Sequence, residues 1–487
     1  MSSLSQWMRR SGLILAAIVV FIPWIVIGQR GGQGGGAAGG QGGGAGRGQG
    51  GAQPGAGGGR GAQAPLPEKP TAVVLPTVSQ EVTGPGQPFN STSSLPPGRD
   101  LEYYKYEAKE YFLTGTANGK PYKTRIVVRK PKQAAKFSGL VIAEAMHPSG
   151  ASHMFEFTSD YTMSSGHMAV EIFTSGLNEL TAANQERYKD LSVSGDQTNE
   201  VIAQVGALVK AKKAGTPFAN LQVRKMVLLG TSATAAVLMN YLPAHLVYRT
   251  PDMQRIFDGF LPMSTGQNAP KIDVPLIQVP TMTEVIGNAT TRPDGDAEGD
   301  QFRLYEFAGM AHVDSRDSVR FKPDPCGKPK SNFPEQAYMS VALNHLLQWV
   351  DKNKLPPRAD RIEVDRDTAN DGSPMALDAT GNAKGGIRNP YVDVPVAKFS
   401  VRNEAAATPI PNPSAWIVAH GAGAPAQMCG LAGYEIAMSK DDLRKMYTDK
   451  KHYQDRVKKR LDELEKAGWS LTVYHDLILG DAAKVEF

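Results

Sequence analysis

The sequence predicts an α/β fold with a mostly parallel, doubly wound central sheet. Short apolar runs, typical of strands buried on both faces, alternate with amphipathic segments of helical periodicity. Strands that alternate with helices of about 10–16 residues indicate βαβ units. The length of 487 residues suits one large α/β domain or two domains and excludes a peptide or a simple binding module.

The elements follow in order along the chain. Asn118-Gly119 between two runs rich in Tyr, Val and Thr is a hairpin signal, so an antiparallel pair should open the domain. The predicted strands are Tyr104–Thr116, Tyr122–Arg129, Gly139–Ala145, His167–Phe173, Lys225–Leu229, Ile256–Leu261, Val274–Val279 and Phe302–Phe307. The predicted helices are Phe155–Ser165, Thr198–Lys213, Ala233–Leu242 ended by Pro243, Glu335–Lys352, and Asp441 to Ala467.

The C-terminal part has a different character. Beyond Pro356-Pro357 the sequence is irregular and rich in Gly, Asn and Pro to about Ser400. The last predicted helix has Ser439 as its N-cap and Gly468 as its stop. Residues 360–487 lack the strand content of an independent domain, so we expect an extension or lid packed onto the core of one domain, 66–487.

The N-terminus predicts export. Between Arg10 and Arg30 there is no charge, and Leu13–Ile27 is apolar apart from Pro23. A basic start before such a run indicates a signal peptide or signal anchor over residues 1–28. Residues 11–28 reach the lower limit for spanning a bilayer, so length leaves cleavage and a membrane tether both open. The predicted location is periplasmic or extracellular, with or without an anchor.

A flexible linker follows over residues 29–65. Nineteen of the residues from Gly31 to Gly61 are glycine, and such a segment has no apolar area to bury. Residues 1–65 carry five arginines and no acid, so removing them from the net charge of +5 leaves a neutral domain. A neutral domain predicts no basic groove, and therefore no nucleic-acid partner.

Two cysteines, Cys326 and Cys429, fit an oxidising compartment. They either form one disulfide that closes a long loop or remain as two buried thiols. The sequence alone leaves both possibilities open.

The segment that carries chemistry is Val227-Leu-Leu-Gly230-Thr-Ser232-Ala-Thr234. A buried strand that runs directly into a helix, with Gly-x-Ser at the junction, meets the needs of a nucleophile elbow, where small residues flank a serine on a sharp turn. The residue two beyond the serine is Thr234, so the strict Gly-x-Ser-x-Gly motif is not fulfilled. By itself, Gly-x-Ser is more often a helix N-cap than a catalytic site.

The partners of such a serine occur in the required order. A serine needs an imidazole to take its proton, and the imidazole needs a carboxylate to orient it. Glu284 follows one predicted strand and His312 follows the last one, which matches the order serine, acid, histidine of this kind of sheet. The alternative acids are Asp258, at the preceding strand, and Asp314 and Asp317, in the histidine loop.

The remaining polar candidates are assigned more simply. The oxyanion donors should be the backbone N–H of Ala233 and one from the loop after the third strand, at Met146 or His147. His147 and His153 line the substrate cleft or are solvated loop residues. His245, His345 and His452 are expected to be structural. No His-Glu-x-x-His motif or Cys/His cluster occurs, so we expect no metal and no cofactor.

Five stretches in order resemble a known family: LLGTSATAAVLMNYL, IFDGFLPMSTG, VPLIQVPTMTEV, FRLYEFAGMAHVD and GNAKGGIRNPYVDVPVA. They are similar to the bacterial alpha/beta hydrolase domain-containing proteins, serine hydrolases related to esterases. The likeness runs from about Thr71 through the C-terminal region. It implies the α/β-hydrolase fold, with Ser232, Glu284 and His312 at the triad positions. The chain departs from the family after the serine, where Ala233-Thr234-Ala235 replaces an expected Gln or Ser-Ala run. This difference bears on the shape of the pocket more than on the activity.

Two classes of function follow as hypotheses. The first is an exported serine hydrolase that cleaves a small-molecule carboxylic ester through an acyl-enzyme; a variant of it uses the same residues for acyl transfer or amide cleavage. The second is a non-catalytic, surface-tethered binding protein on a hydrolase scaffold, suggested by Thr234 and the anchor-like N-terminus. The five stretches indicate a reaction class and do not specify the acyl group or the alcohol.

Overall fold

The computed structural model describes residues 64–92, 95–287, 289–316, 323–365, 374–408, 421 and 423–487. The predicted signal or anchor and nearly all of the predicted linker lie outside this range, as does Asp317. Within the described part of the chain, no helix is long and apolar enough to cross a membrane.

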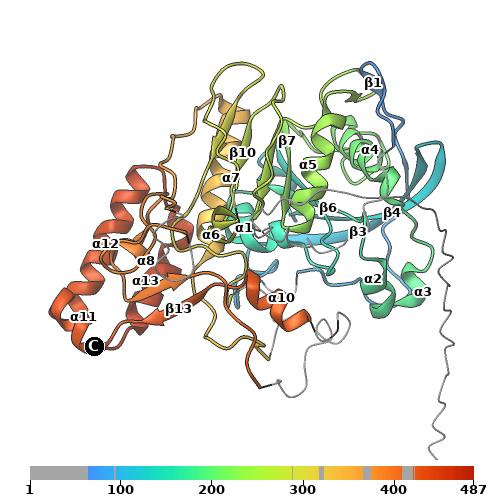
Figure 1. Cartoon of the computed structure of the whole chain (residues 1–487). Coiled ribbons are helices and arrows are strands. Elements are labelled where there is room, and N and C mark those ends of the chain that lie inside the picture. The colour runs from blue at the N-terminus through green and yellow to red at the C-terminus, as the bar shows by residue number, and fades with distance from the viewer. Residues whose placement is uncertain are drawn as a thin grey trace, which may run out of the picture. The chain divides into compact units, whose positions relative to one another are not determined.

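The centre of the domain is a mostly parallel sheet, in which nine strands are described (Figure 1). Its strands are β2 (Thr77–Val78), β3 (Tyr106–Ala117), β4 (Lys120–Pro131), β5 (Leu140–Ala145), β6 (Met168–Ile172), β7 (Lys225–Thr231), β9 (Gly259–Met263), β10 (Leu276–Gln278) and β11 (Phe302–Leu304). Their spatial order is β11-β10-β9-β7-β5-β6-β4-β3-β2. The strands from β5 to β11 pair in parallel, whereas β2, β3 and β4 are antiparallel. This confirms the predicted fold class and the opening hairpin.

Helices cover both faces of this sheet because the strand residues alternate between two cores. Ile142, Val227 and Leu229 pack on one face with α1 (His153–Ser164) and α7 (Glu335–Lys352). Val141, Ala143 and Leu228 pack on the other with α4 (Thr198–Ala211) and α5 (Ala233–His245). Successive strand residues point to opposite faces, so each parallel strand is apolar throughout.

Shorter elements connect these layers. They are β1 (Thr71–Ala72), which pairs with β8 (Tyr248–Arg249), the helices α2 (Leu177–Ala183), α3 (Gln185–Tyr188) and α6 (Met282–Ile286), and the 3₁₀ turns at Ala134–Lys136, Gly195–Gln197 and Thr472–Tyr474.

The C-terminal region packs onto the same core. It contains α8 (Pro390–Asp393), β12 (Ala397–Ser400), α10 (Ala424–Leu431), β13 (Tyr434–Ala437), α11 (Lys440–Tyr447), α12 (Lys450–Lys466) and α13 (His475–Lys484). β12 and β13 form a two-stranded antiparallel sheet. Tyr447, Leu461 and Tyr474 belong to one buried cluster with Leu346 of α7 and Ile277 of β10. The described residues of 360–487 therefore share a buried core with the sheet and α7.

Several predicted boundaries are wrong. The single helix from Asp441 to Ala467 is two helices, because Thr448 has a φ of 65° and Asp449 starts α12 by accepting the His452 N–H. Ser439 is the N-cap of α11, as predicted. Helix α5 continues past Pro243, since that proline lies in the last turn and costs the helix only one hydrogen bond. The strand predicted at Ile256–Leu261 begins only at Gly259.

Cys326 and Cys429 form a disulfide across 103 positions of sequence. This decides between the two possibilities that the sequence left open. Cys429 lies in α10 and is fully buried.

Candidate active site

The predicted site residues meet at one edge of the sheet. Ser232 follows β7, Glu284 lies in α6 just after β10, and His312 lies eight residues after β11. Because these strands are parallel neighbours or near neighbours, their carboxyl ends face the same edge. The structure brings all three side chains together, although the chain separates Ser232 from His312 by 80 residues.

The turn that presents Ser232 is sharp. Ser232 has φ 53° and ψ −118°, a conformation that residues with a side chain rarely adopt. The turn needs Gly230, because a Cβ there would lie 2.3 Å from the carbonyl oxygen of Thr234. This geometry is the strand-to-helix elbow that the sequence predicted.

Thr234 replaces the second glycine of the strict motif and closes the turn with its own side chain. Its hydroxyl accepts the Thr231 N–H at 2.9 Å and donates to the Thr231 carbonyl at 3.0 Å. The side chain is buried. The departure from the motif is therefore compatible with the elbow, a point that residue spacing alone did not reveal.

A continuous row of hydrogen bonds joins the three side chains, and we call it the Ser232–His312–Glu284 row. The distance from Ser232 Oγ to His312 Nε2 is 2.9 Å, and that from His312 Nδ1 to Glu284 Oε1 is 2.5 Å. In the tautomer whose Nδ1 proton is held by the carboxylate, Nε2 can accept the hydroxyl proton of the serine. The row has the chemistry needed to activate a serine as a nucleophile.

The surroundings of Glu284 favour its ionised form. Burial raises the pKa of its carboxyl group, but the charge of His312 and hydrogen bonds from His312 and Thr281 outweigh this effect, so the pKa is lowered. Oε2 accepts the Thr281 N–H at 2.8 Å and the Thr281 hydroxyl at 2.7 Å. One carboxylate oxygen thus fixes the start of α6, and the other binds the imidazole.

The backbone of the His312 loop is fixed as well. The His312 N–H donates to Thr283 Oγ1 at 3.2 Å, and Met282 N–H donates to the Met310 carbonyl at 2.8 Å. Neither Thr281 nor Thr283 was among the predicted site residues. The Thr-x-x-Glu pattern of a capping box was a sequence signal that could have identified Thr281.

Neither of the two alternative acids in the described ranges, Asp258 and Asp314, takes the place of Glu284. Asp258 precedes β9 and therefore lies at the opposite, amino end of the strand. Its carboxylate pairs with Lys210 at 2.8 Å and accepts the Met226 N–H at 2.8 Å. Asp314 is buried two residues after His312, and its Oδ1 accepts the Arg316 N–H at 2.6 Å.

The predicted oxyanion donors are only partly supported. Ala233 is the first residue of α5, where backbone N–H groups have no partner within the helix. The N–H of Met146 instead donates to the Ile172 carbonyl at 2.7 Å, because pairing with β6 extends one residue past β5. The N–H of His147 donates to the Ala151 carbonyl at 2.9 Å and closes its loop. In this structure, both N–H groups predicted for the second donor are already engaged.

The other histidines have separate surroundings. His147 and His153 stack with ring centroids 4.2 Å apart beside the β5 loop. His245 binds Asp273, and buried His345 contacts the Tyr305 hydroxyl at 3.1 Å. Across the described ranges, no group of three His, Cys, Asp or Glu side chains is placed to hold a metal ion.

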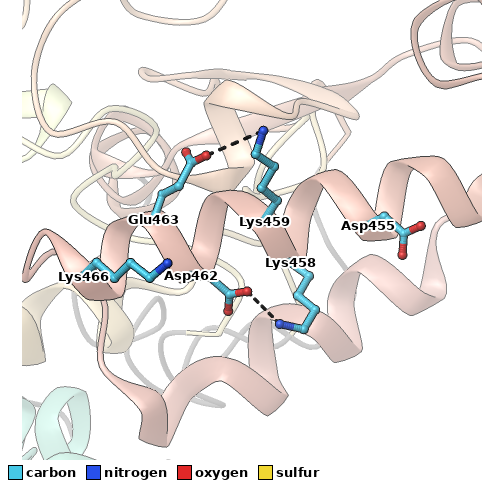
Figure 2. Close-up of a pocket in the computed structure, with 6 residues that line it drawn as sticks. All are labelled: Asp455, Lys458, Lys459, Asp462, Glu463 and Lys466. Atoms are coloured by element: carbon cyan, nitrogen blue, oxygen red, sulfur yellow. Dashed lines mark hydrogen bonds and ion pairs between the residues drawn. The ribbon is translucent and has the colours of Figure 1, made fainter.

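One surface hollow is separate from the row. It lies along α12 and is lined by the charged side chains Asp455, Lys458, Lys459, Asp462, Glu463 and Lys466 (Figure 2). Lys458 pairs with Asp462 and Lys459 with Glu463. These residues form a solvated helix face, and none of them contributes to the Ser232–His312–Glu284 row.

A serine on a sharp strand-to-helix turn, followed along a mostly parallel sheet by an acid and a histidine, defines the α/β hydrolase class of protein. A family model described as an alpha/beta hydrolase domain matches residues 64–479, and this chain belongs to that family. The match covers both the sheet and most of the C-terminal region. A search of curated proteins finds no match.

Solved structures with a similar chain course include esterases. A cold-adapted esterase from an Arctic intertidal metagenomic library is 11% identical, with 41% of this chain and 84% of that chain covered at a TM-score of 0.25. LpqC, a poly(3-hydroxybutyrate) depolymerase from Bordetella parapertussis, is 10% identical, with 52% and 91% covered at 0.30. The esterase Est22 is 9% identical, with 44% and 76% covered at 0.30. Likeness at this level does not transfer their substrates to this chain.

Proposed function

We propose that this chain is an exported serine hydrolase that cleaves a carboxylic ester through an acyl-enzyme. The observation that supports it most directly is the Ser232–His312–Glu284 row, with 2.9 Å between hydroxyl and imidazole and 2.5 Å between imidazole and carboxylate. Membership of the alpha/beta hydrolase family supports the same reaction class.

The proposed reaction has two halves. Ser232 Oγ forms a bond to the ester carbonyl carbon while its proton passes to His312 Nε2, and the Ala233 N–H stabilises the oxyanion. His312 then gives this proton to the leaving alcohol as the ester bond breaks and an acyl-serine remains. A water molecule, deprotonated by His312, releases the acid and restores the serine. Glu284 stabilises the imidazolium in both halves.

Export is part of the proposal and rests on separate support. The basic start, the apolar run from Leu13 to Ile27 and the glycine-rich linker fit a secreted or membrane-tethered enzyme. The Cys326–Cys429 disulfide fits an oxidising compartment. Cell fractionation with N-terminal sequencing of the mature protein tests this part: a cytoplasmic chain with an intact N-terminus would contradict it.

A fluorophosphonate probe tests the nucleophile. Wild-type protein should be labelled on Ser232, and Ser232→Ala should lose both labelling and hydrolysis of p-nitrophenyl acetate. Ser264→Ala, at a buried serine after β9, serves as the matched control and should still be labelled. Equal labelling of wild type and Ser232→Ala would refute the assignment. If wild type hydrolyses the ester and His312→Ala does not, the hypothesis of a non-catalytic binding protein is excluded.

A further inference from the structure

The residue that follows His312 pairs with the C-terminal region. Val313 and Ala432 form a parallel bridge, and the Gly433 N–H donates to the Val313 carbonyl at 3.0 Å. On the other side, the Ala432 carbonyl accepts the Asn403 N–H at 3.1 Å. The segment Ala432–Gly433 is therefore fixed beside the loop that carries His312.

Gly433 also packs directly behind the residue that precedes His312. A Cβ on Gly433 would lie 2.5 Å from the Cβ of Ala311, closer than real Cβ contacts allow. Gly433 is not among the residues with positive φ, so space and not backbone conformation requires a glycine there. Ala311 is fully buried and has no room to yield without moving the chain next to His312.

The disulfide fixes the entry to this segment. Helix α10 ends at Leu431, immediately before Ala432, and Cys429 within it is bonded to Cys326. The backbone of Cys326 in turn forms an isolated antiparallel β-bridge with Ala405. Val313, Met428 and Ala432 pack in one small buried cluster, against which Cys326 and Leu431 also pack. A covalent bond and a small apolar core thus hold the segment against the His312 loop.

We propose that Gly433 is a positioning residue for His312: its missing side chain sets the distance between the C-terminal region and Ala311, and thereby the seat of the imidazole against Ser232. This rests on the proposed function, since the position of His312 matters for turnover only if His312 is the base. It assigns the C-terminal region a part in building the site.

Gly433→Ala tests the contact. The added methyl group should push Ala311 and lower kcat for p-nitrophenyl acetate on the order of 10- to 100-fold, with KM changed less than about 2-fold, because sub-ångström to ångström misplacement of a reacting group has effects of this size. The matched control is Gly430→Ala in α10, where an added Cβ meets nothing within 4 Å. It should leave kcat unchanged.

A second substitution tests rescue. In Gly433→Ala/Ala311→Gly, the methyl group at 433 occupies the space vacated at 311, so kcat should return to within about 3-fold of wild type. If Gly433→Ala does not fold, Ala311→Gly alone tests the same contact from the other side and should lower kcat. A folded Gly433→Ala with wild-type kcat, or a loss that Ala311→Gly does not relieve, would overturn the proposal.

A spectroscopic measurement separates this proposal from the proposed function. The imidazole ¹⁵N resonances of His312 should shift in Gly433→Ala, return in the double variant and stay unchanged in Gly430→Ala. This result needs no turnover. If wild type neither hydrolyses esters nor reacts with the fluorophosphonate, the proposed function fails, while the resonances still decide whether Gly433 positions His312. Unchanged resonances in Gly433→Ala would refute the positioning role.

Discussion

At the scale of single residues, the site depends on side chains that perform two tasks at once. Glu284 binds His312 with one oxygen and starts α6 through Thr281 with the other. Thr234 occupies the position of the second glycine in Gly-x-Ser-x-Gly and still permits the elbow by hydrogen bonding to Thr231. In both arrangements a polar side chain satisfies backbone groups that a tight turn would otherwise leave without partners.

Replacing Glu284 with glutamine should disturb both the charge and the tautomer of His312. Glu284→Gln keeps the size of the side chain, but its amide N–H2 would face Nδ1 and remove the carboxylate that holds the Nδ1 proton, so kcat should fall on the order of 10³- to 10⁴-fold. Steady-state kinetics on p-nitrophenyl acetate measures this. Asp258→Asn is the matched control, because its carboxylate binds Lys210 at the opposite strand end; its kcat should remain within a few fold of wild type. Equal losses in both variants would contradict the assignment of the acid.

At the scale of elements, some helices begin at a residue whose side chain caps them, and the sequence can predict such a boundary. Other helix boundaries are set by tertiary packing. Ser439 begins α11 through its side chain, as the sequence predicts. The break at Thr448 and Asp449 was missed because the charged run on both sides continues with helical periodicity. Tertiary packing also favours the continuation of α5 past Pro243, because Leu242 and Ala244 on either side of it are fully buried.

The disulfide is the element-scale feature with the clearest effect on stability. It closes a loop of 103 residues, and opening such a loop costs about 2–5 kcal/mol of unfolding free energy. Cys326→Ser/Cys429→Ser should therefore unfold at lower urea concentration, with the slope of the transition as the check on two-state behaviour. Dithiothreitol should leave the urea midpoint of the double variant unchanged. It should lower the midpoint of wild type toward that of the double variant, because it reduces the disulfide. Identical midpoints for wild type and the double variant would contradict this expectation.

At the scale of the whole molecule, one buried core joins the sheet to the C-terminal region, and titratable groups enclosed in it link stability to pH. His345 of α7 packs against Tyr305 and Trp469. Burial lowers the pKa of His345 from 6.5 to about 4. The unfolded chain therefore binds a proton at this histidine between pH 6.5 and about 4, where the folded chain does not. Stability from this group is present above pH 6.5 and is lost as the pH falls.

His345→Gln should remove this dependence. Between pH 7.5 and pH 5, the unfolding free energy of wild type should fall by about 2 kcal/mol more than that of the variant, from 1.36 kcal/mol per pKa unit. Urea unfolding at both pH values measures the difference, which cancels contributions from other groups. A parallel course for wild type and His345→Gln would show that this imidazole does not titrate differently in the folded state.

The sequence by itself determined the fold class and the strands before and after the site, and it offered Ser232, Glu284 and His312 in the required order, because these depend on local periodicity and chain order. It left Asp258, Asp314 and Asp317 open as alternative acids, and the contact between Glu284 and His312 emerged only in the tertiary structure. Apolar runs mark buried strands, and Ser232, Glu284 and His312 each directly follow a strand or its loop. The tertiary structure alone decided that Cys326 meets Cys429, that Met146 and His147 already use their N–H groups, and that Gly433 lies behind Ala311. The disulfide, the Met146 hydrogen bond and the Gly433 contact join segments that are distant in the chain. The His147 hydrogen bond depends on the exact direction of the backbone within its loop. Neither residue type nor spacing encodes such packing, which arises only when the core closes.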